Sequence, residues 1–217
     1  MGRIFHSLNY CLQKELVGCN SVLDLGCGPS SPLQHCVNVK YSVGVEAFRH
    51  YLEETQKRMI HTKYINKRIE ELDFPENNFD AVIMLEVLEH LPQKEGYEII
   101  KKAEKWARKK IILSTPNGYF PMEEVDNNIY QNHLSGWDVG KLKKEGFLIR
   151  GLSGAKIMYS SENRVKSIIG NNKEVIFANL RFKPKEIVYT VNAIAQIAVH
   201  YFPRLAFGLW AIKRKKI

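Results

Sequence analysis

The feature that most constrains this chain is the glycine-containing stretch Val22-Leu23-Asp24-Leu25-Gly26-Cys27-Gly28-Pro29. A short apolar run over residues 21–25 ends at these glycines, which predicts a buried strand followed by a sharp turn. Because Gly26 and Gly28 have no Cβ, the backbone can turn tightly there and approach a ligand closely. In open α/β sheets, ligands bind beyond the carboxyl ends of parallel strands. The stretch therefore predicts a site for a nucleotide-like ligand.

The residues around the two glycines favour one such ligand. The dinucleotide fingerprint G-x-G-x-x-G needs a third glycine at position 31, where this sequence has Ser31. The carboxylate of Asp24 would repel a pyrophosphate, whereas S-adenosylmethionine (SAM) carries a sulfonium and an amino group and has no phosphate. Glu46 follows the next apolar run, and a carboxylate there can accept hydrogen bonds from both ribose hydroxyls. These residues favour SAM over NAD.

Apolar runs and amphipathic stretches alternate along the chain, a pattern typical of a parallel sheet covered by helices on both faces. We expect one α/β domain over residues 1–217, with an irregular decoration at 154–183 and a C-terminal helix–strand unit at 184–217. Strands are predicted at 21–25, 42–45, 63–65, 79–84, 110–114, 147–152 and 205–212. Helices are predicted at 6–17, 48–60, 93–109, 135–145 and 187–202.

The net charge of +9 is concentrated near the C-terminus, where residues 184–217 hold six Lys and Arg but only one acidic residue. A solvated tail is the simplest interpretation, with weak contact to an anionic membrane surface as an alternative and nucleic-acid binding as a less favoured one. The four cysteines form no C-x-x-C pair and no export signal precedes them. We therefore expect reduced thiols, no metal site and a cytoplasmic protein.

Residues 187–202 contain no Lys, Arg, Asp or Glu, but the run is shorter than the roughly 20 apolar residues that a transmembrane helix needs. Ile187, Val191, Ile194 and Ala198 recur at helical spacing. We expect this apolar face to pack against the sheet, with a membrane-surface helix as the alternative.

Four motifs together resemble the class I SAM-dependent methyltransferases, most closely the small single-domain group related to ubiquinone and menaquinone biosynthesis. They are residues 22–28, Gly44-Val45-Glu46, residues 74–80 and the stretch Leu85-Glu86-Val87-Leu88-Glu89-His90-Leu91, and the resemblance covers residues 10–153. It implies a Rossmann-like, doubly wound, seven-stranded and mostly parallel sheet with an antiparallel last strand. It also implies a cofactor-binding set of Asp24, Gly26, Cys27, Gly28, Glu46, Ala47, Arg68, Ile69, Leu85 and His90.

One member of that set departs from the family pattern. Arg68 stands where many relatives have an acid near the adenine amine. A guanidinium cannot accept a hydrogen bond, so backbone groups at Arg68 and Ile69, or the side chain of Glu70, would have to hold the adenine.

Methyl transfer needs an acceptor aligned with the sulfonium, and a base only if the acceptor loses a proton. Glu86 and His133 are the predicted catalytic residues, because Glu86 follows a buried strand and a histidine titrates near neutral pH. Tyr130, Gln131 and Trp137 are the predicted acceptor-binding residues, and Ser135 is a candidate helix cap. The alternatives are a helix-start carboxylate at Glu86 and an ordered loop held by a buried aromatic anchor.

The sequence thus predicts a methyltransferase that acts on a small-molecule, lipid or glycan-precursor acceptor. The first alternative is RNA methylation, which the excess of Lys and Arg over Asp and Glu favours. Against it, Leu85-Glu86-Val87-Leu88 stands where many nucleic-acid methyltransferases carry an Asn/Asp-Pro-Pro-Tyr-type motif. The second alternative is a SAM-binding module without catalytic activity.

Overall fold

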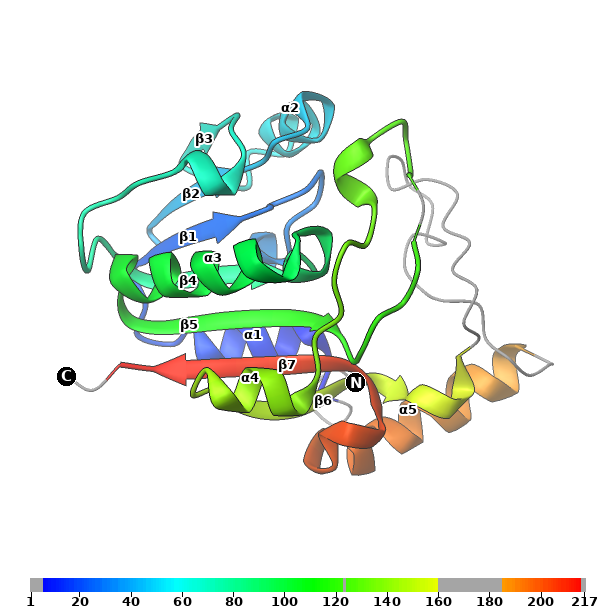
Figure 1. Cartoon of the computed structure of the whole chain (residues 1–217). Coiled ribbons are helices and arrows are strands. Elements are labelled where there is room, and N and C mark those ends of the chain that lie inside the picture. The colour runs from blue at the N-terminus through cyan, green and yellow to red at the C-terminus, as the bar shows by residue number, and fades with distance from the viewer. Residues whose placement is uncertain (1–5, 123, 160–184, 216–217) are drawn as a thin grey trace.

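The structure is a computed structural model that describes residues 6–122, 124–159 and 185–215. Its centre is a seven-stranded sheet with the order β3-β2-β1-β4-β5-β7-β6 (Figure 1). The strands are β1 (Ser21–Leu25), β2 (Tyr41–Val45), β3 (Lys63–Ile65), β4 (Phe79–Leu85), β5 (Ala107–Pro116), β6 (Leu148–Ala155) and β7 (Ala206–Arg214). The α-helices are α1 (Leu8–Glu15), α2 (Arg49–Lys57), α3 (Gln93–Trp106), α4 (Val139–Lys144) and α5 (Lys185–Tyr201).

The sheet has the topology that the resemblance implies. Strands β1 to β5 pair in parallel, and β7 runs antiparallel to both β5 and β6. The chain builds outward from β1 to β3 and then returns to place β4 on the other side of β1. This reversal between β1 and β4 is the place where open α/β sheets bind ligands, beyond the carboxyl ends of the strands. The expected Rossmann-like sheet with its antiparallel last strand is therefore confirmed.

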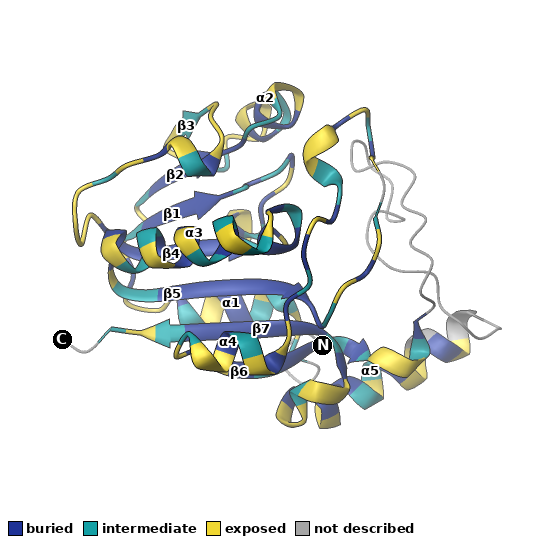
Figure 2. Cartoon of the chain, viewed as in Figure 1, coloured by how far each residue is buried: buried dark blue, intermediate teal, exposed yellow. Residues whose placement is uncertain are grey.

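Two apolar layers cover the sheet (Figure 2). One layer contains the buried faces of α3 and α4, including the fully buried Trp106 and Leu142. The other contains Leu12 and Leu16 from α1 and its following turn, packed against the opposite side of β1, β4 and β7. The inner strands are buried on both faces, which explains why their sequences are almost continuously apolar.

The face of α5 that packs against the sheet is not the face that was predicted. Ile187, Val191 and Ile194 were expected to pack on the sheet, but they are 60%, 48% and 60% exposed. The buried face instead carries Asn192 and Gln196, together with Val188, Val199 and His200. Within the described ranges, no helix, α5 included, combines the length and apolar character that crossing a bilayer requires.

The polar face of α5 is buried because it satisfies backbone groups of β6. Gln196 accepts from the Gly154 N–H at 2.7 Å and donates to the Gly151 carbonyl at 3.0 Å, while Asn192 accepts from the Ala155 N–H at 2.7 Å. A Cβ on Gly151 would lie 2.0 Å from the carbonyl oxygen of Val199, so the helix backbone touches the strand there. Buried backbone polar groups need such partners, and this requirement sets the orientation of α5.

Several predicted boundaries shift. The helix predicted at 93–109 ends at Trp106, and β5 begins at Ala107. The helix predicted at 135–145 is shortened to α4, whose N-cap is Asp138 and not Ser135. Of the decoration predicted at 154–183, residues 154–159 complete β6 and a short 3₁₀ turn, and residues 160–183 lie outside the described residues.

The turn after β1 is closed by a buried hydrogen bond. The Ser31 hydroxyl donates to Asp24 at 2.5 Å, and the same hydroxyl accepts from the Leu33 N–H at 3.1 Å. The Nε2 atom of His61 lies 3.5 Å from the Asp24 carboxyl group. Burial raises the pKa of Asp24 to about 7 and lowers that of His61 to about 4, so the pair is uncharged at mildly acidic pH. Ser31, the residue that breaks the dinucleotide fingerprint, thus organises the loop.

The raised pKa of Asp24 predicts a stability loss as the pH rises. Between the unfolded value, near 3.9, and about 7, the folded state holds a proton that the unfolded state releases, so the free energy of unfolding falls across this interval. Asp24→Asn removes this titration while leaving an acceptor for Ser31. We expect the stability of the variant relative to the natural chain to grow by on the order of 3 kcal/mol from pH 5 to pH 8. Urea unfolding across this range measures the difference, and parallel profiles would contradict the assignment.

Candidate functional site

The two glycines of the first loop have the left-handed backbone that their sequence position suggested. Gly26 has φ of +68° and Gly28 has φ of +56°. A Cβ on Gly26 would lie 2.7 Å from a methyl carbon of Val87, which joins this loop directly to the segment after β4. No atom lies within 4 Å of the corresponding point on Gly28, so that side of the loop is open to a ligand.

Glu46, at the end of β2, closes the loop from the other side. It is 8% exposed, and its two oxygens accept from the N–H groups of Gly28 at 3.0 Å and Phe48 at 2.8 Å. Burial raises the pKa of Glu46, and the backbone donors partly oppose that shift. Asn66 donates to the carbonyl oxygens of Glu46 and Ala47 at 2.8 and 2.9 Å and so fixes the turn. Sequence reasoning missed Asn66, because its role depends on β3 lying beside β2.

The remaining predicted cofactor residues on the β1 side have different surroundings. The Arg68 side chain is half exposed and pairs with Glu70 at 2.8 Å, whereas Ile69 is buried. Cys27 is buried, and burial raises the pKa of its thiol well above the ordinary range, so the thiol stays protonated. Leu85 is partly exposed at the carboxyl end of β4.

A pair of glutamates marks the carboxyl ends of β4 and β5. Glu86 has φ of +55° and is exposed as a whole residue, but its carboxyl group accepts from the Ser114 hydroxyl at 2.6 Å in a partly buried position. Glu89 is 2% exposed and accepts from the Thr115 hydroxyl at 3.0 Å. Desolvation by the surrounding protein raises the pKa of both carboxyls, and the charge of Glu86 raises that of Glu89 further. Glu89 was not among the predicted site residues.

Two histidines predicted for different roles lie side by side at this place. The rings of His90 and His133 meet edge to face, with their centroids 4.8 Å apart. His133 Nδ1 is 2.6 Å from the Phe120 carbonyl oxygen, and His90 Nδ1 is 3.3 Å from the Asn132 carbonyl oxygen. Burial lowers the pKa of both imidazoles, that of His90 to about 4, so both are neutral near pH 7.

The loop that carries His133 is anchored by its neighbours. The N–H groups of Leu134 and Ser135 donate to the Glu89 carbonyl oxygen at 2.7 and 3.0 Å, and the Ser135 hydroxyl donates to the Leu88 carbonyl oxygen at 3.1 Å. The Trp137 indole N–H donates to that hydroxyl at 3.1 Å. Trp137 is fully buried against α3, which leaves it no surface for an acceptor and makes it the anchor of the loop.

The two other predicted acceptor residues lie in a short 3₁₀ helix, Ile129–Gln131. The Tyr130 side chain is 39% exposed, and Gln131 is half-buried. They therefore remain accessible near the loop that ends at His133.

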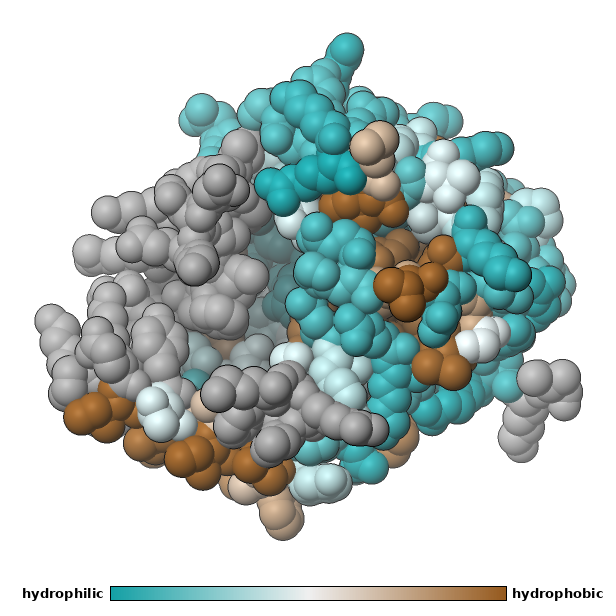
Figure 3. Space-filling view, turned by 180° about the vertical axis from the view of Figure 1, so that it is seen from behind, coloured by the Kyte–Doolittle hydropathy of each residue, from teal (hydrophilic) through white to brown (hydrophobic). Residues whose placement is uncertain are grey.

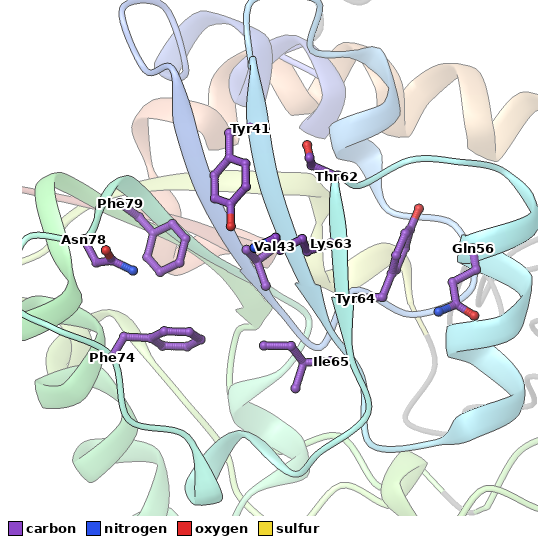
Figure 4. A pocket seen from close by; sticks show the side chains of 10 residues that line it. All are labelled: Tyr41, Val43, Gln56, Thr62, Lys63, Tyr64, Ile65, Phe74, Asn78 and Phe79. Carbon is purple, nitrogen blue, oxygen red and sulfur yellow. The ribbon is translucent and has the colours of Figure 1, made fainter.

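A cavity of about 490 Å³ lies elsewhere, at the edge of the sheet (Figure 4). Tyr41, Lys63 and Phe79 line it from the amino ends of β2, β3 and β4. The glycine loop and Glu86 lie at the carboxyl ends, so this cavity belongs to a different end of the sheet.

Comparison with known proteins is consistent with this arrangement. Residues 22–110 match the family model described as "Methyltransferase domain". No curated protein sequence matches the chain. Among solved structures, a SAM-dependent methyltransferase from Archaeoglobus fulgidus is 17% identical, with 99% of this chain and 97% of that chain covered and a TM-score of 0.56.

Two further structures share the fold over a smaller part of the chain. A putative methyltransferase from Bacillus halodurans is 16% identical, covers 65% of this chain and 69% of its own, and has a TM-score of 0.52. The N-terminal domain of EvdMO1, solved with S-adenosylhomocysteine (SAH) and D-fucose, is 18% identical, with coverages of 67% and 74% and a TM-score of 0.52. Residues 22–110, which hold the glycine loop and the glutamate pair, thus match a methyltransferase domain, and the seven-stranded sheet has the fold of the solved methyltransferases.

Proposed function

We propose that the chain transfers the methyl group of SAM to an oxygen of a small-molecule, lipid-linked or glycan-precursor acceptor. The observation that carries this proposal is the convergence of Glu86, Glu89, His90 and His133 beside the cofactor loop. Val87 lies within this group and contacts Gly26, so the polar side chains adjoin the place where a methyl donor would bind. Neutral imidazoles and carboxylates can both orient a hydroxyl and accept its proton.

The first loop has the chemistry that SAM needs. SAM supplies an activated methyl group, so the chain's own residues have only to bind and align the reactants. The open side of Gly28 would admit the methionine part, and Glu46 keeps a second acceptor position on each oxygen for ribose hydroxyls. Asp24, Gly26, Cys27 and Ala47 would complete this half of the site, with Ile69 and Leu85 on the other side of the cofactor.

The proposed acceptor class rests on the surroundings of His133. The segment 129–135 crosses this end of the sheet and leaves Tyr130 and Gln131 accessible for a polar acceptor. The EvdMO1 domain was crystallised with a sugar, which supports a small acceptor on this fold. RNA methylation and binding of SAM without catalysis are the two competing functions.

The cofactor and acceptor halves of the site predict two separable variants. Glu46→Gln removes a charged acceptor for ribose, so we expect SAM and SAH to bind roughly 10- to 100-fold more weakly. His133→Ala should leave this binding nearly unchanged and lower methyl transfer once an acceptor is found. Thermal shift titrations with SAM, SAH and NAD measure the first effect, because a ligand of the folded state raises its stability.

Each competing function predicts a different outcome of these titrations and of the transfer assay. Stabilisation by NAD alone would overturn the SAM site. Binding to RNA that weakens steeply with salt, together with methylation of that RNA, would favour the first competitor. If the rate of methyl transfer is unchanged in His133→Ala, the proposed role of this histidine is wrong.

The outward face of α5 supports a lipid-linked acceptor. Its exposed apolar residues continue beyond the helix into Phe202 and Leu205, both 63% exposed, and Figure 3 shows hydrophobic side chains gathered in a row along this segment. Arg204 lies within the same stretch, and Arg150 lies 5.7 Å from the Tyr201 ring. An apolar ridge beside cations, on a chain of net charge +9, suits an anionic membrane surface.

Deleting the C-terminal unit cannot test this surface, because β7 is an inner strand of the sheet. Ile187→Gln combined with Ile194→Gln alters two outward side chains, both 60% exposed. In co-sedimentation with phosphatidylglycerol-containing vesicles, we expect the affinity of the double variant for the vesicles to be at least about tenfold lower. The reason is that each Ile side chain buried in the membrane surface contributes roughly 1.5–3 kcal/mol to binding. Val37→Gln, at a 93% exposed site in another part of the chain, is the matched control. Equal sedimentation of all three proteins, or none by the natural chain, would contradict the surface.

A further inference from the structure

Three side chains beside the proposed acceptor position form a set that can ligate a metal. One ligand atom from each of Glu89, His90 and His133 lies within 4.8 Å of the other two. Ligand atoms around one transition-metal ion, with bonds of about 2.1 Å, are separated by roughly 3 to 4 Å, so modest side-chain rotation would bring the three into a coordination sphere. Two imidazoles and one carboxylate on one side of an ion, with open positions opposite, are a recurrent site for divalent transition metals.

Each of the three side chains is already held by a second group. A carbonyl oxygen can only accept, so the contacts with Phe120 and Asn132 place the protons of His133 and His90 on Nδ1. The Nε2 lone pairs of both rings are then available as ligands. The Thr115 hydroxyl orients Glu89 in the same way. Protein metal sites show this arrangement, in which a carbonyl or hydroxyl fixes the tautomer and direction of every ligand.

The burial of the Glu89 carboxyl group also favours a bound cation. Glu89 is 2% exposed, and in the part of the chain that the structure describes it forms no ion pair with Lys or Arg. Buried carboxylates are normally paired with a cation or bound to a metal. Oxygen ligands alone would suit Mg²⁺ or Ca²⁺, whereas two imidazoles favour an ion such as Mn²⁺, Fe²⁺, Co²⁺ or Zn²⁺.

We propose that Glu89, His90 and His133 bind one divalent transition-metal ion, which holds the oxygen of the methyl acceptor. This deepens the proposed function and rests on it for the role of the ion. A hydroxyl bound to such an ion loses its proton more easily, as metal-bound water does. In the reaction the O–H proton leaves to solvent, the oxygen forms a bond to the methyl carbon, and the bond from that carbon to sulfur breaks, giving a methyl ether and SAH. The acceptor class is therefore narrowed to molecules with a hydroxyl that can reach this ion.

The test is a titration of the full chain, stripped with a chelator, with Mn²⁺ alone, followed by calorimetry and electron paramagnetic resonance. We expect one bound Mn²⁺ per chain and at least about tenfold weaker binding in Glu89→Gln, His90→Ala and His133→Ala. His50→Ala, which alters an exposed histidine on α2, should bind like the natural chain. Absence of saturable binding, or equal binding in all variants, would overturn the proposal.

A second measurement covers variants that fail to fold. Co²⁺ bound to the natural chain should give visible absorption characteristic of nitrogen ligation, and this absorption should disappear when Zn²⁺ displaces the Co²⁺ ion. A spectrum like that of aqueous Co²⁺ would also overturn the proposal. Thermal shift with SAH reports on the cofactor half separately. If SAH raises the melting temperature but no metal binds, the metal proposal fails and the proposed methyl transfer stands. If metal binds but SAH does not raise the melting temperature, the proposed methyl transfer fails and the metal site stands.

Discussion

The close approach of Gly26 to Val87 is the contact on which the rest of this site depends. It presses the loop after β1 against the segment after β4, and these are the two strands between which the sheet order reverses. Any side chain at position 26 would enter the volume of a Val87 methyl group, and the positive φ would strain it as well. A single glycine thus holds the cofactor loop next to the glutamates and histidines of the other half. If the two segments were separated, the cofactor loop and the cluster of glutamates and histidines would each keep their residues but would no longer adjoin.

The strands and the first loop could be predicted because their signals are local. The residues of β1 match the predicted range, since a strand buried on both faces needs a continuous apolar sequence. The range of β3 also matches, although β3 is a partly exposed strand at the edge of the sheet. The outward face of α5 could not be predicted in this way. Its apolar spacing indicated an inward-facing stripe, yet backbone groups near Gly151 and Gly154 require the polar partners that Asn192 and Gln196 supply. Which face of a helix is buried therefore depends on whether the neighbouring strand has backbone groups that need hydrogen-bond partners.

The grouping of Glu89, His90 and His133 was hidden for a related reason. Each residue was visible in the sequence, but His90 was predicted to bind the cofactor, His133 was predicted to be catalytic, and Glu89 was assigned neither role. Hydrogen bonds from the Leu134 and Ser135 N–H groups to the Glu89 carbonyl bring the distant loop onto the short 3₁₀ helix Leu88–His90, which follows β4. No sequence spacing encodes that contact. The same is true of Trp137, whose burial under Gly96 makes it part of the core.

The placement of β7 between β5 and β6 also affects how the chain is assembled. Among the described strands β7 is synthesised last, yet it is the only link between β6 and the rest of the sheet. While the ribosome is still adding residues before 206, β6 has no partner strand and β5 has an open edge. Unpaired edges of this kind favour association with other chains. The sheet is complete only when β7 pairs with β5 and β6, and such pairing between segments distant in the sequence slows folding. A stalled or truncated product would therefore display β5 as an exposed, strongly apolar edge and would be a natural substrate for chaperones.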